Sequence, residues 1–106
     1  MAAVCIQVIN PNTSLAMTET IGAAARAAAA PGTEILAVCP REGVPSIEGH
    51  FDEAIAAVGV LEQTKAGRQQ GVDGHVIACF GDPGLLAATG CPPRHCRHAY
   101  FDHQML

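Results

Sequence analysis

Residues 3–14 read AVCIQVI followed by NPNTS, and this stretch decides the fold. Apart from Gln7, its first seven residues are apolar and rich in β-branched side chains, which is typical of a strand buried in a parallel sheet. Its last five are turn and helix-capping residues. Residues 15–30 then favour a helix, because seven of the last eight residues are alanine. The stretch therefore predicts a β-α unit.

The sequence repeats this alternation twice more. Residues 34–39 and 74–78 predict two further short strands. A helix that ends by Gly71 is predicted between them, because five apolar residues recur there at helical spacing: Phe51, Ala54, Ile55, Val58 and Leu61. Asp82 and Pro83 are predicted to cap and open a third helix.

The order β-α-β-α-β-α predicts the fold class α/β. It indicates a three-stranded parallel sheet with right-handed crossover helices, in strand order 2-1-3. At 106 residues and 10.9 kDa, the sequence has room for one hydrophobic core. Alanine supplies 19 of these residues, and such small side chains suit helices packed closely on a parallel sheet.

Composition and charge exclude several classes of function. Apolar residues make up 49% of the sequence and charged residues 15%, so it is not a disordered, purely solvating segment. The net charge is −4 with six Lys and Arg, which leaves no basic face for nucleic acid or acidic lipid. Aromatic residues make up 4% and tryptophan is absent, so a base-stacking platform is also missing. We therefore expect no nucleic-acid partner.

The first residues and the cysteines indicate a cytoplasmic protein. The apolar run that ends at Ile9 is interrupted by Gln7, has no positive residue before it, and is too short to cross a membrane. The five cysteines are an odd number and are widely spaced except for the last pair. We therefore expect free thiols, no membrane partner and a cytoplasmic location.

Three loops are expected to meet at one edge of the sheet, because parallel sheets bind ligands beyond the carboxyl ends of their strands. These loops span residues 10–14, 39–46 and 79–84. In the first loop, Asn10, Thr13 and Ser14 add polar side chains to a helix N-terminus, which suits a carboxylate or carbonyl group. Ordinary helix capping by Asn12, Thr13 or Ser14 explains the same residues.

Cys79 follows the third predicted strand and precedes a helix start. A helix N-terminus favours the reactive thiolate, whereas the neighbouring Asp82 carboxylate disfavours it. A single cysteine after a strand is also commonly a small core residue. Cys5 lies in mid-strand and Cys39 at a strand end, and neither carries a further signal. Position alone therefore leaves Cys79 open between a catalytic and a core role.

Residues 89–106 differ from the rest of the sequence. They hold three of the five histidines and two of the five cysteines, without helical or strand periodicity. Cys91, His95, Cys96 and His98 are zinc-type ligands, but their spacing matches no familiar zinc pattern. We therefore predict no metal site and a disordered tail unrelated to residues 1–88, and we keep a small zinc-binding protein as a third hypothesis.

Three segments form a specific series in this sequence. They are INPNTS at residues 9–14 with Met17 and Thr18, PSIEG at 45–49 with DEA at 52–54, and DG at 73–74 leading to ACFGDPG at 78–84. In order and spacing, residues 1–88 resemble the hydantoin racemase branch of the aspartate/glutamate racemase superfamily, which includes allantoin racemases.

This resemblance implies a cofactor-independent racemase or epimerase with a small-molecule substrate, such as a hydantoin, allantoin or another amino-acid derivative. It implies two similar α/β domains with the active site between them, and a homo-oligomer for the full-length family. One thiolate removes a proton from the stereocentre, and a second thiol returns one from the opposite face. The resemblance assigns the first of these two cysteines to Cys79.

The resemblance also implies substrate-binding residues. Asn10 and the hydroxyls of Thr13 and Ser14 would hold carbonyl or carboxylate groups of the substrate. Four further residues would line the pocket or contact the substrate: Pro45, Ser46, Phe80 and Gly81. The resemblance implies neither a metal nor a cofactor.

Two departures from the family pattern bear on activity. The sequence contains no second strand-end cysteine motif, and it has about half the length expected of a two-domain member. The change of character after Ala88 resembles a reading-frame shift followed by an early stop. We therefore expect the truncated first domain of an Asp/Glu racemase-like fold, inactive on its own. A non-catalytic α/β fragment or a small-ligand-binding remnant is the alternative.

Overall fold

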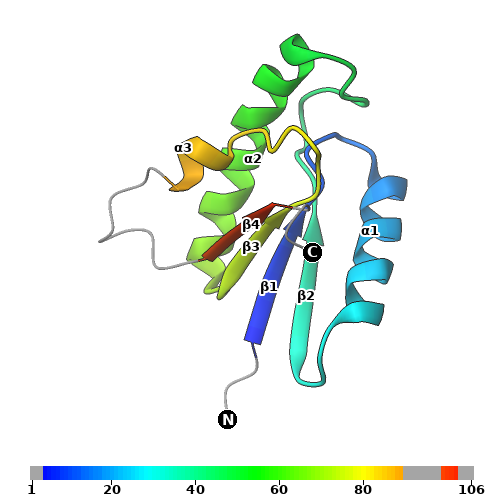
Figure 1. Ribbon diagram of the computed structural model, residues 1–106, viewed down its shortest axis with the longest axis vertical. Helices are drawn as coiled ribbons and strands as arrows, with labels where there is room; N and C mark the ends of the chain where they lie inside the picture. The colour runs from blue at the N-terminus through cyan, green and yellow to red at the C-terminus, as the bar shows by residue number, and fades with distance from the viewer. Residues whose placement is uncertain (1–3, 90–98, 103–106) are drawn as a thin grey trace.

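The computed structural model describes residues 4–89 and the backbone of residues 99–102. Helices and strands alternate along the chain as predicted (Figure 1), which confirms the α/β fold class. The elements are β1 (Val4–Ile9), α1 (Leu15–Ala28), β2 (Thr33–Val38), α2 (His50–Gln70), β3 (Gly74–Ile77), α3 (Leu85–Thr89) and β4 (Ala99–Asp102).

The strands form one parallel sheet in the order β2-β1-β3-β4, so the predicted order 2-1-3 of the first three strands is confirmed. β4 corrects the expectation of a disordered tail at residues 99–102. Its sequence shows no alternation, and the open edge of β3 supplies the pairing that defines the strand. Residues 90–98 and 103–106 lie outside the described residues, and the division of the chain after residue 88 remains a prediction.

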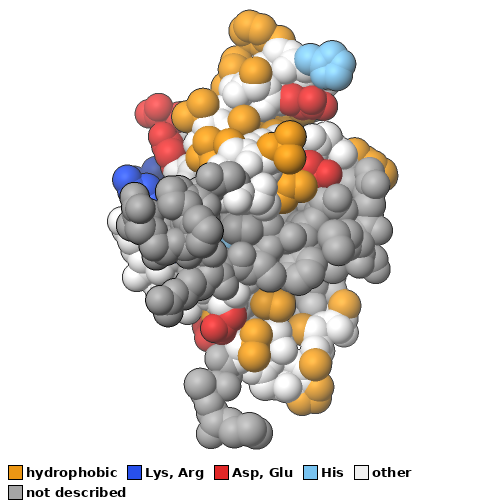
Figure 2. All heavy atoms as spheres, turned by 60° about the vertical axis from the view of Figure 1, so that its left-hand side comes forward, with side chains coloured by type: hydrophobic (Ala, Val, Ile, Leu, Met, Phe, Trp, Pro, Cys, Tyr) orange, Lys and Arg blue, Asp and Glu red, His pale blue; other side chains and the backbone are white. Residues whose placement is uncertain are grey.

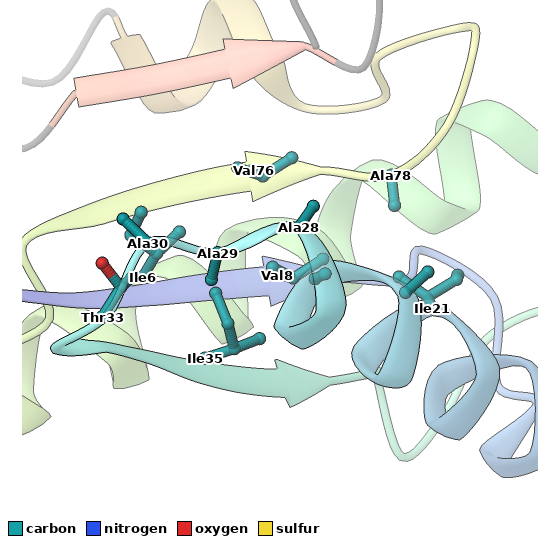
Figure 3. A pocket seen from close by; sticks show the side chains of 12 residues that line it. Ile6, Val8, Ile21, Ala28, Ala29, Ala30, Thr33, Ile35, Val76 and Ala78 are labelled. Carbon is teal, nitrogen blue, oxygen red and sulfur yellow. The ribbon is translucent and has the colours of Figure 1, made fainter.

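Helices α1 and α2 cover opposite faces of the sheet (Figure 1), and the strand side chains alternate between these two faces. Ile9 and Ile77 point toward α2 and form the core with Val60, and all three side chains are fully buried. Ile6 and Val8 lie on the other face. There, a groove of about 640 Å³ with apolar walls separates part of α1 from the sheet (Figure 3).

The apolar stripe that identified α2 lies on its outer side. Phe51 is 78% exposed and Val58 is 59% exposed. Figure 2 shows hydrophobic side chains gathered at the upper end of the molecule, where the first turns of α2 lie. The buried residues of α2 are mostly small: Ala56, Gly59, Val60, Thr64 and Gly67. Close packing on the sheet, rather than side-chain hydrophobicity, therefore selects the inner face of this helix.

A buried polar contact joins β1, β3 and α2. The side-chain amide of Gln7 donates to the carbonyl oxygen of Gln63 at 2.9 Å, and Oε1 of Gln7 lies 2.6 Å from Nδ1 of His75. Since an amide oxygen can only accept, Nδ1 of His75 is the donor in this contact. Gln7 and His75 are almost completely buried, where polar groups require hydrogen bonds. The contact therefore fixes α2 over the centre of the sheet.

Gly67 makes room for this contact, because a Cβ at that position would lie 2.5 Å from Oε1 of Gln7. We predict that Gly67→Ala lowers the free energy of unfolding by about 2 kcal/mol, a usual cost of overpacking a core. Helix propensity alone would instead raise it by about 1 kcal/mol. Chemical denaturation measures the sign, and a stabilised variant would contradict the packing argument.

Gly49→Ala is the matched control for this measurement, because a Cβ on Gly49 meets no atom within 4 Å. Gly49 is the N-cap residue of α2. We expect its replacement to change the free energy of unfolding by less than about 1 kcal/mol, the size of a capping effect.

Candidate active site

The loops that follow β1, β2 and β3 begin side by side at the carboxyl edge of the sheet, as predicted. The backbone N–H of Asn10 donates to the Val38 carbonyl oxygen at 2.9 Å, and that of Ala78 donates to the Ile9 carbonyl oxygen at 2.9 Å. Hydrogen bonding between neighbouring strands therefore continues one residue past their ends. This places the first residues of all three loops at one edge.

Asn10 is 1% exposed, and its side chain is occupied within its own loop. Its amide nitrogen lies 2.7 Å from Oδ1 of Asn12, 3.1 Å from Oγ1 of Thr18 and 3.3 Å from the Ser14 carbonyl oxygen. The backbone N–H of Asn12 donates back to Oδ1 of Asn10 at 3.4 Å. In this arrangement Asn10 shapes the loop, and direct contact with a substrate remains a prediction.

The Ser14 hydroxyl caps α1, because its Oγ accepts from the backbone N–H of Met17 at 3.1 Å. Ser14 is therefore a helix cap, which was one of the two roles that the sequence left open for it. Thr13 ties two loops together: its backbone N–H donates to the Val44 carbonyl oxygen at 3.0 Å. The Thr13 hydroxyl makes no hydrogen bond among those the structure describes, so it is the more available of the two.

The other predicted substrate-binding residues lie on two separate loops. Pro45 and Ser46 follow Val44 directly and are exposed, so the contact with Thr13 places them beside the loop after β1. Phe80 is 81% exposed on the loop after β3. The structure thus brings Thr13 close to the Pro45–Ser46 segment. Phe80 and Gly81 lie near Cys79 because they follow it directly in the sequence.

Cys79 is half-buried directly after Ala78, at the carboxyl end of β3. It packs against the core residues Ile9, Val60 and Ile77. Its carbonyl oxygen accepts from the backbone N–H of Asp82 at 3.2 Å, which closes a turn over residues 79–82. Cys79 therefore both contacts the core and reaches the surface at the edge where the loops begin.

The predicted capping of α3 by Asp82 and Pro83 is wrong. The helix begins at Leu85, whose backbone N–H donates to the Asp82 carbonyl oxygen at 3.0 Å. Asp82 has φ of 46° and Gly84 has φ of 80°. Left-handed backbone at both residues cannot continue a helix, so the chain makes a tight turn first.

Glu53 is a residue of this region to which the sequence analysis assigned no role. It lies in the first turn of α2, where an acidic side chain is favoured by the helix dipole. A Cβ placed on Gly81 would lie 2.5 Å from Oε1 of Glu53, so the carboxylate rests against the loop that carries Cys79. The DEA motif contained this residue, but its proximity to Gly81 depends on tertiary structure.

The three described cysteines have free thiols. Burial raises the pKa of the Cys5 thiol, and the carboxylates of Glu34 and Asp73 raise it further. Among residues 4–89, no three His, Cys, Asp or Glu side chains gather as a metal site requires, and no helix there is long and apolar enough to span a membrane. The zinc-type side chains of the tail lie outside the described residues.

A cysteine at a strand end, with polar and glycine-rich loops beside it on a parallel sheet, agrees with the class of racemase that the sequence motifs indicated. Residues 6–98 match the Asp/Glu/Hydantoin racemase family, and the chain belongs to this family. The chain is 55% identical over 83 residues to a hydantoin racemase of Pseudomonas sp. (strain NS671), a match that covers 78% of this chain and 33% of the relative.

Solved structures agree with this assignment. An allantoin racemase from Klebsiella pneumoniae is 90% identical with a TM-score of 0.79, over 80% of this chain and 35% of that one. An allantoin racemase from Pseudomonas fluorescens is 41% identical with a TM-score of 0.70, over 74% of this chain and 33% of that one. The chain therefore spans about a third of the length of the relatives it matches.

We predict that iodoacetamide alkylates Cys79 faster than Cys5 and Cys39. Cys79 reaches the surface on a loop, whereas the raised pKa of Cys5 lowers its thiolate fraction at neutral pH. Peptide mapping by mass spectrometry after brief labelling gives the three rates. Faster labelling of Cys5 or Cys39 would contradict the assignment, and Cys91 and Cys96 are left out because they lie outside the described residues.

The pH dependence of Cys5 labelling gives a separate prediction. Only the thiolate reacts, so a raised pKa shifts the midpoint of the rate against pH above that of the uncharged reference thiol N-acetylcysteine amide. Glu34→Gln removes one negative charge and should move this midpoint back toward the free thiol. A midpoint at or below that of N-acetylcysteine amide in the unmodified chain would show that Cys5 is not shielded.

Proposed function

We propose that this chain supplies one side of the active site of a cofactor-independent racemase that acts on hydantoin, allantoin or a related amino-acid derivative. The observation that carries the proposal is the 90% identity with the allantoin racemase from Klebsiella pneumoniae. The position of Cys79 at the carboxyl edge supports it, because ligands of parallel sheets bind at that edge.

The reaction needs a base on one face of a stereocentre and an acid on the other. A C–H beside a carbonyl group is acidic enough for a positioned thiolate, provided that hydrogen-bond donors stabilise the enolate oxygen. In our proposal the Cys79 thiolate removes this proton. A second thiol, from the part of the relatives' length that this chain does not span, returns a proton to the opposite face.

The residues of these loops have different roles in the proposed substrate binding. We assign carbonyl or carboxylate contacts to the Thr13 hydroxyl, whereas Asn10 and Ser14 hold the loop in shape through the bonds described above. The exposed side chains of Pro45, Ser46 and Phe80 are placed to line a pocket. The thiols and these donors suffice for the chemistry, so the proposal includes no cofactor. It places the protein in the cytoplasm and the full-length enzyme in a homo-oligomer.

We predict that the 106-residue chain does not racemise an enantiopure 5-substituted hydantoin or allantoin, because Cys79 serves only one face. An open half-site also leaves the enolate in bulk water, where fixed donors are worth less. Polarimetry over time measures this. Decay above the buffer rate that disappears in Cys79→Ala would show that 106 residues suffice. The absence of decay agrees with the alternative of a non-catalytic, ligand-binding fragment, so a second experiment is needed.

A chimera provides that second experiment. Residues 6–88 of this chain replace the matching segment of the Klebsiella pneumoniae allantoin racemase, and we expect the chimera to racemise allantoin. Cys79→Ala in the chimera should lower the rate about 100-fold or more, the usual contribution of a general base. Cys39→Ala is the matched control and should leave the rate near that of the chimera. A Cys79→Ala chimera that stays active would refute the role of Cys79.

A further inference from the structure

The loop between β3 and α3 rests on one side of α2. Glu53, Ala57 and Val60 follow each other at helical spacing and therefore lie on one face of the helix. A Cβ on Gly84 would lie 3.2 Å from the Ala57 carbonyl oxygen and 3.3 Å from Cγ1 of Val60. A Cβ on Gly81 would lie 2.5 Å from Oε1 and 2.8 Å from Cδ of Glu53. This face of α2 therefore holds the loop at two glycines.

The two glycines are constrained in different ways. Gly84 has φ of 80°, a conformation that favours glycine whatever surrounds it. Gly81 is not among the described residues with positive φ, so its backbone accepts any L-residue. The contact that crowds position 81 is therefore the one with the Glu53 carboxylate, which is the end of a flexible side chain.

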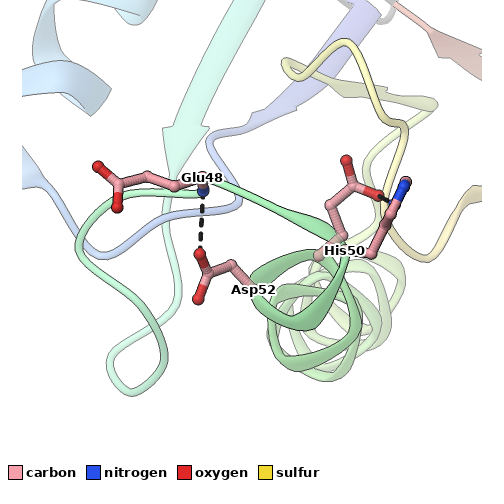
Figure 4. A network of polar contacts seen from close by, with 4 residues as sticks. Glu48, His50 and Asp52 are labelled. Carbon is pink, nitrogen blue, oxygen red and sulfur yellow. Dashed lines mark hydrogen bonds and ion pairs between the residues drawn. The ribbon is translucent and has the colours of Figure 1, made fainter.

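The first turn of α2 holds Glu53 in place. Oδ2 of Asp52 accepts from the backbone N–H of Glu48 at 3.0 Å, which ties the preceding loop to the helix start (Figure 4). Nδ1 of the fully exposed His50 lies 3.4 Å from Oε2 of Glu53 (Figure 4). The Glu53 side chain is 34% exposed, so most of it is enclosed between this turn and the loop.

Movement at Gly81 reaches Cys79 through a closed turn. The Asp82 N–H donates to the Cys79 carbonyl oxygen at 3.2 Å, so Gly81 is the third residue of a four-residue turn that begins at Cys79. A side chain at position 81 must displace either Glu53 or this turn. A displacement of about 1 Å is enough to change the rate of a positioned group many-fold.

We propose that Glu53 is a positioning residue for Cys79, which acts by packing its carboxylate against the backbone of Gly81. The catalytic meaning of this contact rests on the proposed function of Cys79. The contact itself does not depend on any catalytic activity of the chain. Its test therefore measures thiol chemistry and not racemisation, so that the two proposals can fail separately.

The experiment measures the iodoacetamide rate of Cys79 relative to Cys39 in the full chain. Gly81→Ala should change this ratio by about threefold or more, because the shifted turn changes how far the Cys79 thiol is exposed to the reagent. Adding Glu53→Asp shortens the side chain by one methylene and keeps its charge, so the double variant should return within about 1.5-fold of the unmodified ratio. Adding Glu53→Gln keeps the size and removes the charge, so this double variant should not recover.

Gly49→Ala is the matched glycine control and should leave the ratio unchanged, since a Cβ there meets nothing within 4 Å. An unchanged ratio in Gly81→Ala overturns the proposal, as does rescue by Glu53→Gln equal to that by Glu53→Asp. If Gly81→Ala does not fold by circular dichroism, Glu53→Ala is measured in the unmodified background. A change of about threefold or more supports the proposal only if Glu53→Gln, which keeps the side-chain size, leaves the Cys79 ratio unchanged. An unchanged ratio in Glu53→Ala, or an equal change in both variants, overturns it.

Discussion

The close approach of α2 to the sheet is the constraint on which the rest of the structure depends. A Cβ on Gly67 would lie 2.5 Å from Oε1 of Gln7 in β1, and one on Gly59 would lie 2.6 Å from Cγ of Pro40 in the loop after β2. Protein interiors tolerate no overlap of this size, so small residues decide how near the helix lies. This position brings Val60 into the core and sets the helix face on which the Cys79 loop rests.

The same closeness makes a polar centre possible in a sheet of apolar strands. Gln7 and His75 contact each other on neighbouring strands, and the side-chain amide of Gln7 donates to the Gln63 carbonyl oxygen. An amide or imidazole left without partners in this setting would cost several times a normal hydrogen bond. The network therefore favours one placement of the helix over others that hydrophobic contact alone would allow.

The carboxyl edge combines fixed and available groups. The side chains of Asn10 and Ser14 form hydrogen bonds within the loop itself, which gives that loop a single shape. At the same edge, Thr13 is half-buried and Phe80 is 81% exposed. Preorganisation of this kind suits a reaction in which a carbonyl oxygen gains charge, because donors held in place need not reorganise.

The sequence by itself determined the order of strands and helices, the parallel sheet and the edge at which the loops begin. These follow from local propensity, from alternation of helix and strand, and from the handedness of crossovers. The INPNTS and ACFGDPG segments also indicated the family before any geometry was known.

Tertiary structure alone decided the inner face of α2, the pairing of β4, the left-handed turn at Asp82 and the contact between Glu53 and Gly81. The inner face of α2, the pairing of β4 and the contact between Glu53 and Gly81 depend on residues far apart in the chain. Their free energy comes from close packing or from an unpaired strand edge. The outward stripe of Phe51 and Val58 shows the limit most plainly. Periodicity identified the helix, but only the fit of Gly59 against Pro40 and of Gly67 against Gln7 determined which side is buried.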